Sequence, residues 1–329
     1  MEVCITLNSI IGKTEEKPQK AANSFFSVQK KKLINSRYLM LLFLPGFLVF
    51  TVFKLVPLSG LIIAFEDYTF KGGMFGSEFV GLDNFKQLFA NPYFFTVMKN
   101  TLWISFLKII LGFPCPVILA LIYNEISDGG FKRVTQTITY LPHFFSWVVL
   151  SGMVVTVFSP STGIVNSIIE FCGGTPVYFL ASKKYFVPVL IITDIWKEIG
   201  WGSIVYLAAI SGVSSEIYEA AIIDGAKRWQ KMFYITIPCI MPTIAVMLIL
   251  RLGTVLDAGF DQIFNLYNPA VYDVADIIDT YTYREGIGNY RYSYATAFSF
   301  FKSIVGLVMI LLTNSLVKRF SEDGTGVLY

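Results

Sequence analysis

The sequence is poor in charge. Only 15% of its 329 residues are Asp, Glu, Lys or Arg, whereas 54% are hydrophobic and the mean hydropathy is +0.60. A soluble domain has about 25% charged residues, and a chain of about 300 residues already buries about three quarters of its unfolded surface. So much apolar surface indicates a protein whose solvent is lipid. The net charge of +3 is too small to suggest a polyanion such as nucleic acid as a partner.

Residues typical of catalytic and metal sites are also scarce. The single histidine, His143, argues against a histidine-based catalytic or metal site. The four cysteines form no CxxC motif and no other metal-ligand spacing, so we expect isolated, buried thiols. Gly12-Lys13-Thr14 is not a nucleotide-binding loop, because the glycine required at position 7 is Leu7. We therefore expect no ATP site and no cofactor in this chain.

Long apolar runs are what the sequence has in abundance. A membrane helix needs roughly 20 mainly apolar residues, and six stretches qualify. Several contain proline, which membrane helices tolerate where neighbours satisfy the freed backbone groups. The sequence therefore predicts an all-α membrane protein. Its six expected transmembrane helices are Tyr38–Phe65, Thr101–Tyr123, Ile138–Phe158, Tyr185–Ile210, Cys239–Gly259 and Tyr294–Leu316.

Lys and Arg in the loops set the expected orientation. In a six-span chain the basic loops and both tails fall on one side, and the last loop on the other side is acidic. Both termini are therefore expected to be cytoplasmic. Residues Ser24–Phe26 and the lysines after them could begin an interfacial helix or belong to an unstructured basic tail. The expected regions are a tail at 1–37, a six-helix domain at 38–320 with external loops at about 66–100, 159–184 and 260–293, and a tail at 321–329.

The loop between the fourth and fifth spans, about residues 211–238, has a pattern of its own. Ser215 is expected to cap a short helix whose small residues keep its surface shallow. Gly225 permits a turn that a side chain would strain. A second short helix is expected over Ala226–Tyr234 and ends at Pro238. The loop is predicted to be either an elbow on which a partner docks or an amphipathic surface loop without a partner.

This loop resembles the EAA loop of ABC importer permeases. The shared pattern is Glu-Ala-Ala, a glycine after three intervening residues, and Ile-x-x-Pro from Ile235, with Ile237 where the family has leucine. In that family the loop forms coupling helices that sit in a cleft of a cytoplasmic ATPase. The resemblance implies a type I-like importer fold. The docking residues that it implies are Glu219, Ala220, Ala221, Asp224, Gly225 and Ala226.

Two further stretches narrow the resemblance, which covers roughly residues 35–329. Phe79–Phe85 resembles the segment before the second span of sugar-uptake permeases, and Tyr267–Arg284 is similar to LplB-type permeases. That branch is associated with uptake of oligosaccharides and polysaccharide fragments. The resemblance implies a permease subunit in a bacterial cell membrane, with no catalytic site. The partners it implies are a second homologous permease, two ATPase subunits or domains that bind ATP and Mg, an external solute-binding protein and a carbohydrate.

Ionisable residues inside the predicted spans are candidates for a translocation pathway. Such residues usually face the bundle interior or a wet cavity. A sugar offers hydroxyls to polar side chains and apolar faces to aromatic rings. The alternative is structural, with Lys197 paired to Asp194 or Glu198 and the charges on other spans paired within the bundle. The candidates are Asp194, Lys197, Glu198 and Trp201, which share one helix face at i, i+3, i+4 and i+7, together with Trp196 and Arg251.

Two other functions account for part of the sequence. A secondary transporter driven by an ion gradient would explain the spans and their charges, but it predicts internal repeats, which the sequence does not show. It also leaves the 211–238 loop unexplained. A membrane enzyme is disfavoured by the single histidine and the lack of a Ser or Cys nucleophile motif.

Overall fold

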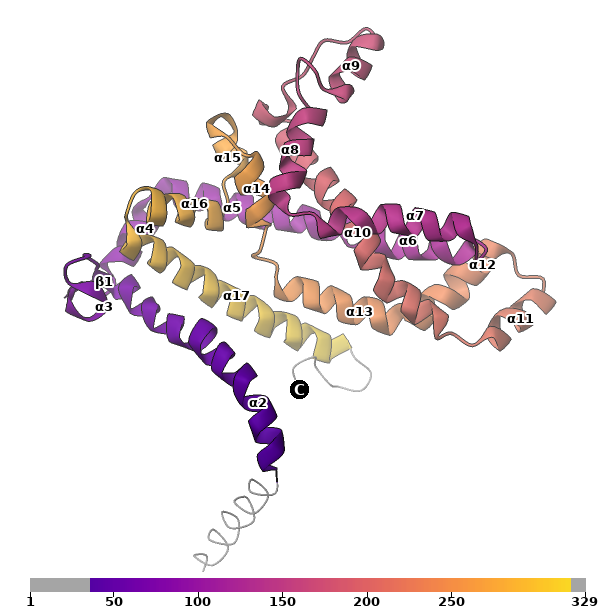
Figure 1. Ribbon diagram of the computed structural model, residues 1–329, viewed down its shortest axis with the longest axis horizontal. Helices are drawn as coiled ribbons and strands as arrows, with labels where there is room; N and C mark the ends of the chain where they lie inside the picture. Colours follow the sequence, from indigo (N-terminus) through magenta and orange to yellow (C-terminus); the bar gives the residue numbers. More distant parts are fainter. Residues whose placement is uncertain (1–35, 321–329) are drawn as a thin grey trace, which may run out of the picture. The chain divides into compact units, whose positions relative to one another are not determined.

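A computed structural model describes residues 36–320, and helices make up most of this region (Figure 1). The expectations for Ser24–Phe26 and for the 321–329 tail lie outside the described residues. The chain divides into a first unit that ends at Leu61 and a second that begins at Ile62. The first unit contains α2 (Arg37–Phe50) and the π-helical η1 (Thr51–Leu55), and η2 (Val56–Phe65) follows.

The second unit begins with a two-stranded antiparallel ribbon, and helices follow it up to the long helix α10. In the ribbon Glu66 pairs with Phe79. The elements up to the fourth long helix are β1 (Glu66–Asp67), α3 (Gly73–Gly76), β2 (Glu78–Phe79), α4 (Asp83–Ala90), α5 (Pro92–Leu107), η3 (Lys108–Gly112), α6 (Pro114–Glu125), α7 (Gly130–Tyr140), η4 (Leu141–Phe144), α8 (Trp147–Val157), α9 (Ile164–Phe171), η5 (Phe179–Ala181) and α10 (Phe186–Ser211).

The rest of the second unit holds the inter-span loop, two long helices and a group of short ones. Within this unit α6 and α7 lie against α10, and α13 lies against α17 (Figure 1). These elements are α11 (Ser215–Ile223), α12 (Arg228–Lys231), η6 (Met232–Thr236), α13 (Ile237–Gly253), α14 (Phe260–Leu266), η7 (Pro269–Val271), α15 (Tyr272–Ala275), α16 (Ile278–Tyr283), η8 (Arg284–Gly288) and α17 (Tyr292–Phe320).

Four helical stretches of the described residues are long and apolar enough to cross a membrane, or five if one bent pair counts as a span. The predicted fourth span is present as the 26-residue helix α10. This helix is not among the four because it contains three charged residues. The predicted fifth span is shorter at its end than expected, since α13 stops at Gly253. The four stretches are Tyr38–Phe65, Pro92–Glu125, Arg228–Gly253 and Tyr292–Leu312.

The expectation of one continuous helix over Ile138–Phe158 is wrong. Gly130–Phe144 and Trp147–Val157 meet at 107°. Pro142 lies in the η4 turn at the break and lacks a backbone N–H. Ser146 then restarts the helix as the N-cap of α8, since its hydroxyl accepts from the Val149 N–H at 3.5 Å.

The break leaves backbone carbonyls without hydrogen-bond donors from their own helix. The side chain of Lys197, on α10, donates to two of them. Its buried Nζ donates to the carbonyls of His143 at 2.8 Å and Phe145 at 3.1 Å. Close approach of α7 to α10 depends on Gly200, where a Cβ would overlap the Thr139 carbonyl. The bent segment is therefore fixed to α10 by one ammonium group and one glycine.

A second buried lysine joins three elements. Lys108, in η3, is 3% exposed, and its Nζ lies 2.8 Å from Asp194 Oδ1 of α10 and 2.6 Å from Gln262 Oε1 of α14. The Gln262 amide in turn donates to the Leu190 carbonyl at 2.8 Å and to Thr193 Oγ1 at 2.9 Å. Each polar group of this network has a partner, as burial requires.

The expected external loop at 260–293 is largely helical and is organised around a carboxylate. Asp276 is fully buried, forms an ion pair with Arg284 and accepts a hydrogen bond from the Tyr93 hydroxyl at 2.9 Å. Burial lowers the pKa of Arg284, but the hydrogen bond and the charge of Asp276 outweigh it and raise that pKa above its ordinary value. The ion pair holds the segment together, and the hydrogen bond from Tyr93 joins it to the start of α5.

The cysteine expectation is only partly correct. Cys115, Cys172 and Cys239 are free thiols, as expected, but Cys172 and Cys239 are exposed rather than buried. Cys239 lies on the long apolar helix α13, where a small apolar side chain can face lipid, whereas Cys172 follows α9 in the 159–184 loop.

We predict that Gly200→Ala destabilises the protein by about 1–3 kcal/mol, because the added methyl group must displace the α7 backbone. The measurement is the thermal unfolding midpoint of the purified protein in detergent. Gly152→Ala is the matched control, since Gly152 is also helical and a Cβ there has nothing within 4 Å. Equal midpoints for the two variants would contradict the role given to Gly200.

We predict that Lys108→Met destabilises the protein by about 3–5 kcal/mol, because it leaves the Asp194 carboxylate without its partner charge. Adding Asp194→Asn to Lys108→Met should recover much of this loss, since no charge then remains unpaired. The same thermal unfolding measurement tests both variants. A double variant less stable than Lys108→Met alone would show that the ion pair does not cause the loss.

Candidate functional site

A cavity of about 360 Å³ lies beside α10 and contains four of the six candidate pathway residues. Asp194, Glu198 and Trp201 line it from α10, and Arg251 lines it from α13. Lys108 of η3 also lines it. Residues from three separate spans of the sequence thus meet at one polar cavity.

The other two candidates do not line this cavity. Lys197 is buried and holds the carbonyls at the bend between α7 and α8. It lies 3.6 Å from Glu198, but the pairing with Asp194 that we considered does not form, because Asp194 pairs with Lys108. Trp196 is 42% exposed and is absent from the residues that line the cavity. The face of α10 that holds the candidates therefore has two parts: Asp194, Glu198 and Trp201 line the cavity, whereas Lys197 packs against the bend.

The charged side chains around the cavity differ in how many hydrogen-bond and ion-pair partners they have. Lys108 is held by Asp194 and Gln262. Arg251 is exposed, and its guanidinium has no hydrogen bond or ion pair within residues 36–320. The Asp257 carboxylate accepts only the Gly259 N–H, at 3.2 Å, among the described groups. The cavity therefore offers one free guanidinium and one lightly bound carboxylate to a ligand.

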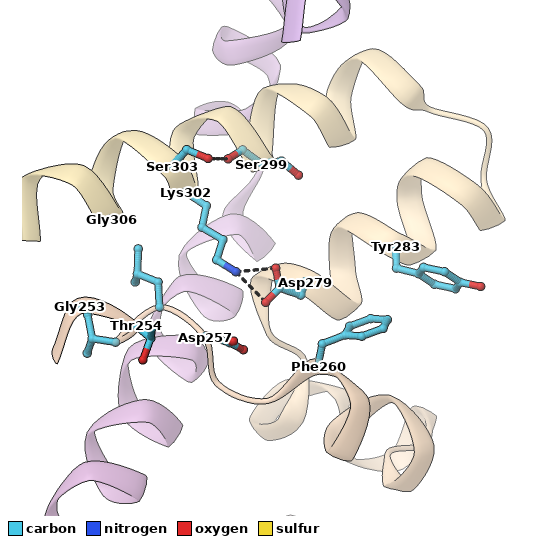
Figure 2. A pocket seen from close by; sticks show the side chains of 12 residues that line it. Gly253, Thr254, Asp257, Phe260, Asp279, Tyr283, Ser299, Lys302, Ser303 and Gly306 are labelled. Carbon is cyan, nitrogen blue, oxygen red and sulfur yellow. Dashed lines mark hydrogen bonds and ion pairs between the residues drawn. The ribbon is translucent and has the colours of Figure 1, made fainter. Parts of the chain in front are cut away.

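Figure 2 shows the residues that line a second cavity, of about 730 Å³. Asp257 lines both. In Figure 2 the ammonium of Lys302, on α17, points to Asp279 of α16 and donates to its two carboxylate oxygens at 2.6 and 2.7 Å. The sequence reasoning missed Asp257 and Asp279 as site residues. An acidic residue at the end of an apolar run was the available signal for Asp257.

The expected elbow is present after α10. The N-cap of α11 is Ser214, one residue before the expected Ser215, and its hydroxyl accepts from the Glu216 N–H at 3.3 Å. Gly225 has φ +78°, and its N–H donates to the Ile222 carbonyl at 3.0 Å. The Ala226 N–H donates to Ala221 at 2.9 Å, which completes a Schellman motif. The glycine is therefore required by the left-handed turn.

The second half of the elbow differs from the expectation. Pro238 does not end a helix: α12, η6 and α13 run on without a break from Arg228 to Gly253. Proline is tolerated there because it lies in the first turn of α13, after the π-helical η6 has taken up the extra residue. The Tyr218 hydroxyl lies 2.9 Å from Thr236 Oγ1 and ties α11 to η6.

The implied docking residues lie together on this elbow and are accessible. Glu219, Ala220 and Ala221 are on α11, and Asp224, Gly225 and Ala226 form the turn that follows it. Ala221 and Ala226 are half-buried and the other four are exposed. Ile222 and Ile223 of the same segment are 57% and 86% exposed. An elbow with small residues and exposed apolar side chains has the surface that a docking element needs.

Comparison with known proteins gives consistent relatives. Residues 112–323 match the family described as binding-protein-dependent transport system inner membrane component. The polygalacturonan/rhamnogalacturonan transport system permease protein YteP of Bacillus subtilis (strain 168) is 44% identical over 89% of this chain and 91% of its own length. Protein LplB of the same organism is 44% identical over 89% of this chain and 92% of its own length.

Solved structures agree with these relatives. A chain of a bacterial alginate ABC transporter, crystallised in complex with an alginate pentasaccharide-bound periplasmic protein, is 44% identical with a TM-score of 0.82. The match covers 90% of this chain and 99% of that one. Since the family match spans more than half of the sequence and these relatives span most of it, the chain belongs to the binding-protein-dependent transport system inner membrane components, the permeases of ABC importers.

Proposed function

We propose that this chain is a transmembrane permease subunit of an ATP-driven importer of oligosaccharides or polysaccharide fragments. The observation that carries the proposal is the exposed elbow of α11 and α12, closed at Gly225 and joined directly to the span that lines the polar cavity. The chain forms half of the pathway and a second homologous permease forms the other half. It carries no catalytic site of its own.

The proposed partners are those of ABC importer permeases, the family to which the chain belongs. Two cytoplasmic ATPase subunits or domains bind ATP and Mg and receive the elbow, and an external binding protein delivers the saccharide. Both termini are then cytoplasmic and the segment at 260–293 is external. Closure of the ATPases moves the elbow and so biases a two-state equilibrium of the spans between inward-facing and outward-facing forms.

The substrate proposal rests on the cavity and on the relatives. Two of the relatives are named for polygalacturonan/rhamnogalacturonan and for alginate, which are polysaccharides that contain carboxylate sugars, and the free Arg251 guanidinium is suited to a carboxylate. Asp194, Glu198 and Asp257 can accept sugar hydroxyls. We therefore propose an acidic oligosaccharide as cargo.

The test of this function is reconstitution of the complete complex in proteoliposomes, followed by uptake of a labelled oligogalacturonide. Uptake that requires ATP, the ATPases and the binding protein supports the proposal. Uptake that needs only this chain and an ion gradient would overturn it in favour of a secondary transporter. Chemical turnover of the saccharide by the purified chain would identify an enzyme instead.

We predict that Gly225→Asp abolishes most uptake while the complex still inserts and assembles, since it adds a charge and backbone strain at the elbow. Gly225→Asn, which has nearly the same shape and the same tolerance of positive φ but no charge, should lose less. Gly129→Asp is the control, because Gly129 is an exposed loop glycine with open space around it. Normal uptake by an inserted Gly225→Asp variant would refute the coupling role.

We predict that Arg251→Gln lowers uptake of an oligogalacturonide by about tenfold, corresponding to about 1.4 kcal/mol. Uptake of the same oligosaccharide with its carboxyl groups reduced to alcohols should change little. Arg251→Lys keeps the charge and should retain part of the activity. The measurement is competition between the two sugars in the same proteoliposomes. An equal loss for both sugars would contradict carboxylate recognition by Arg251.

A further inference from the structure

His143, the single histidine, lies beside the polar cavity without being one of its lining residues. Its Nδ1 is 2.9 Å from Glu198 Oε2. Its ring stacks on that of Trp201, with the centroids 4.6 Å apart and the planes 2° from parallel. Glu198 and Trp201 both line the cavity. The imidazole therefore touches two cavity residues through two different kinds of contact.

Contacts of the backbone and of the next residue hold His143 in place. The His143 carbonyl accepts a hydrogen bond from the buried Lys197 ammonium at 2.8 Å. Phe144, the next residue, packs edge-on against Trp201 with the ring centroids 5.5 Å apart. The bend between α7 and α8 thus places His143 over α10 with little freedom to move away.

We propose that His143 is a positioning residue for saccharide recognition, acting through Glu198 and Trp201. The inference rests on the proposed function. Stacking holds the indole, which is 44% exposed and is one of the residues that line the cavity. The apolar C–H face of a pyranose ring packs on an aromatic face of this kind, as apolar bodies do on aromatic rings in ligand pockets.

The hydrogen bond has a separate effect. With Glu198 ionised, its carboxylate only accepts, and the contact then requires an imidazole that carries a proton on Nδ1. That contact holds one carboxylate oxygen, while the second oxygen, 3.6 Å from the Lys197 ammonium, can still accept a sugar hydroxyl. His143 therefore orients a stacking surface and a hydroxyl acceptor at neighbouring points of one wall.

Three variants separate the two contacts in the reconstituted complex. His143→Asn keeps a donor near the Nδ1 position without the ring, and His143→Phe keeps a ring without the donor. His143→Ala removes both and should lower oligogalacturonide uptake per assembled complex by about tenfold, equivalent to about 1.4 kcal/mol. His143→Asn and His143→Phe, which each keep one contact, should retain more uptake than His143→Ala. The amount of saccharide imported per ATP hydrolysed should be highest in the wild type, lower in these two variants and lowest in His143→Ala.

Trp201→Ala and Trp196→Ala provide the matched comparison. The two tryptophans lie on α10 with exposures of 44% and 42%, but only Trp201 touches His143 and lines the cavity. Trp201→Ala should reduce the imported saccharide per ATP, and Trp196→Ala should not.

Wild-type uptake by His143→Ala would overturn the positioning role while leaving the proposed function standing. Loss explained entirely by reduced complex assembly, with unchanged import per ATP, would also overturn it. Failure of the wild-type complex to import the saccharide would instead count against the proposed function.

Discussion

The buried ammonium group of Lys108 is the interaction on which the rest of the second unit depends. A charge inside an apolar medium is tolerated only with a counter-charge and filled hydrogen bonds. Asp194 and Gln262 meet this need, so η3, α10 and α14 must come together at one point. The same contact sets one wall of the polar cavity. Stability and the geometry of the candidate pathway therefore have a common origin.

At the break between α7 and α8 the groups that need buried partners are backbone carbonyls rather than a charged side chain. Unpaired carbonyls within a span are costly unless a neighbour donates to them. Lys197 does so from α10, and Gly200 on the same helix lets the broken segment approach. Because α10 carries Lys197 on one side and Glu198 and Trp201 toward the cavity, a single helix both anchors the bend and presents polar groups to a ligand.

Local sequence was sufficient where local physics decides. The small residues and Gly225 predicted the elbow, because a left-handed Schellman turn needs a glycine whatever surrounds it. Apart from Ile138–Phe158, where the chain breaks into α7, η4 and α8, the apolar runs predicted long helices, since a helix satisfies its own backbone groups in lipid. The stop expected at Pro238 failed because a proline in the first turn of a helix, preceded by a π-helical turn, does not interrupt it.

The sequence by itself determined the lipid solvent, the helical class, the elbow and the face of α10 that holds ionisable residues. Only the tertiary structure decided which charge meets which, because partners such as Lys108 and Asp194 are 86 positions apart and no local pattern relates them. It also decided that Asp257 joins two cavities and that the discounted His143 lies on Glu198 and Trp201. The physical reason is that pairing in an apolar medium is set by the packing of whole helices, which a local residue pattern does not encode.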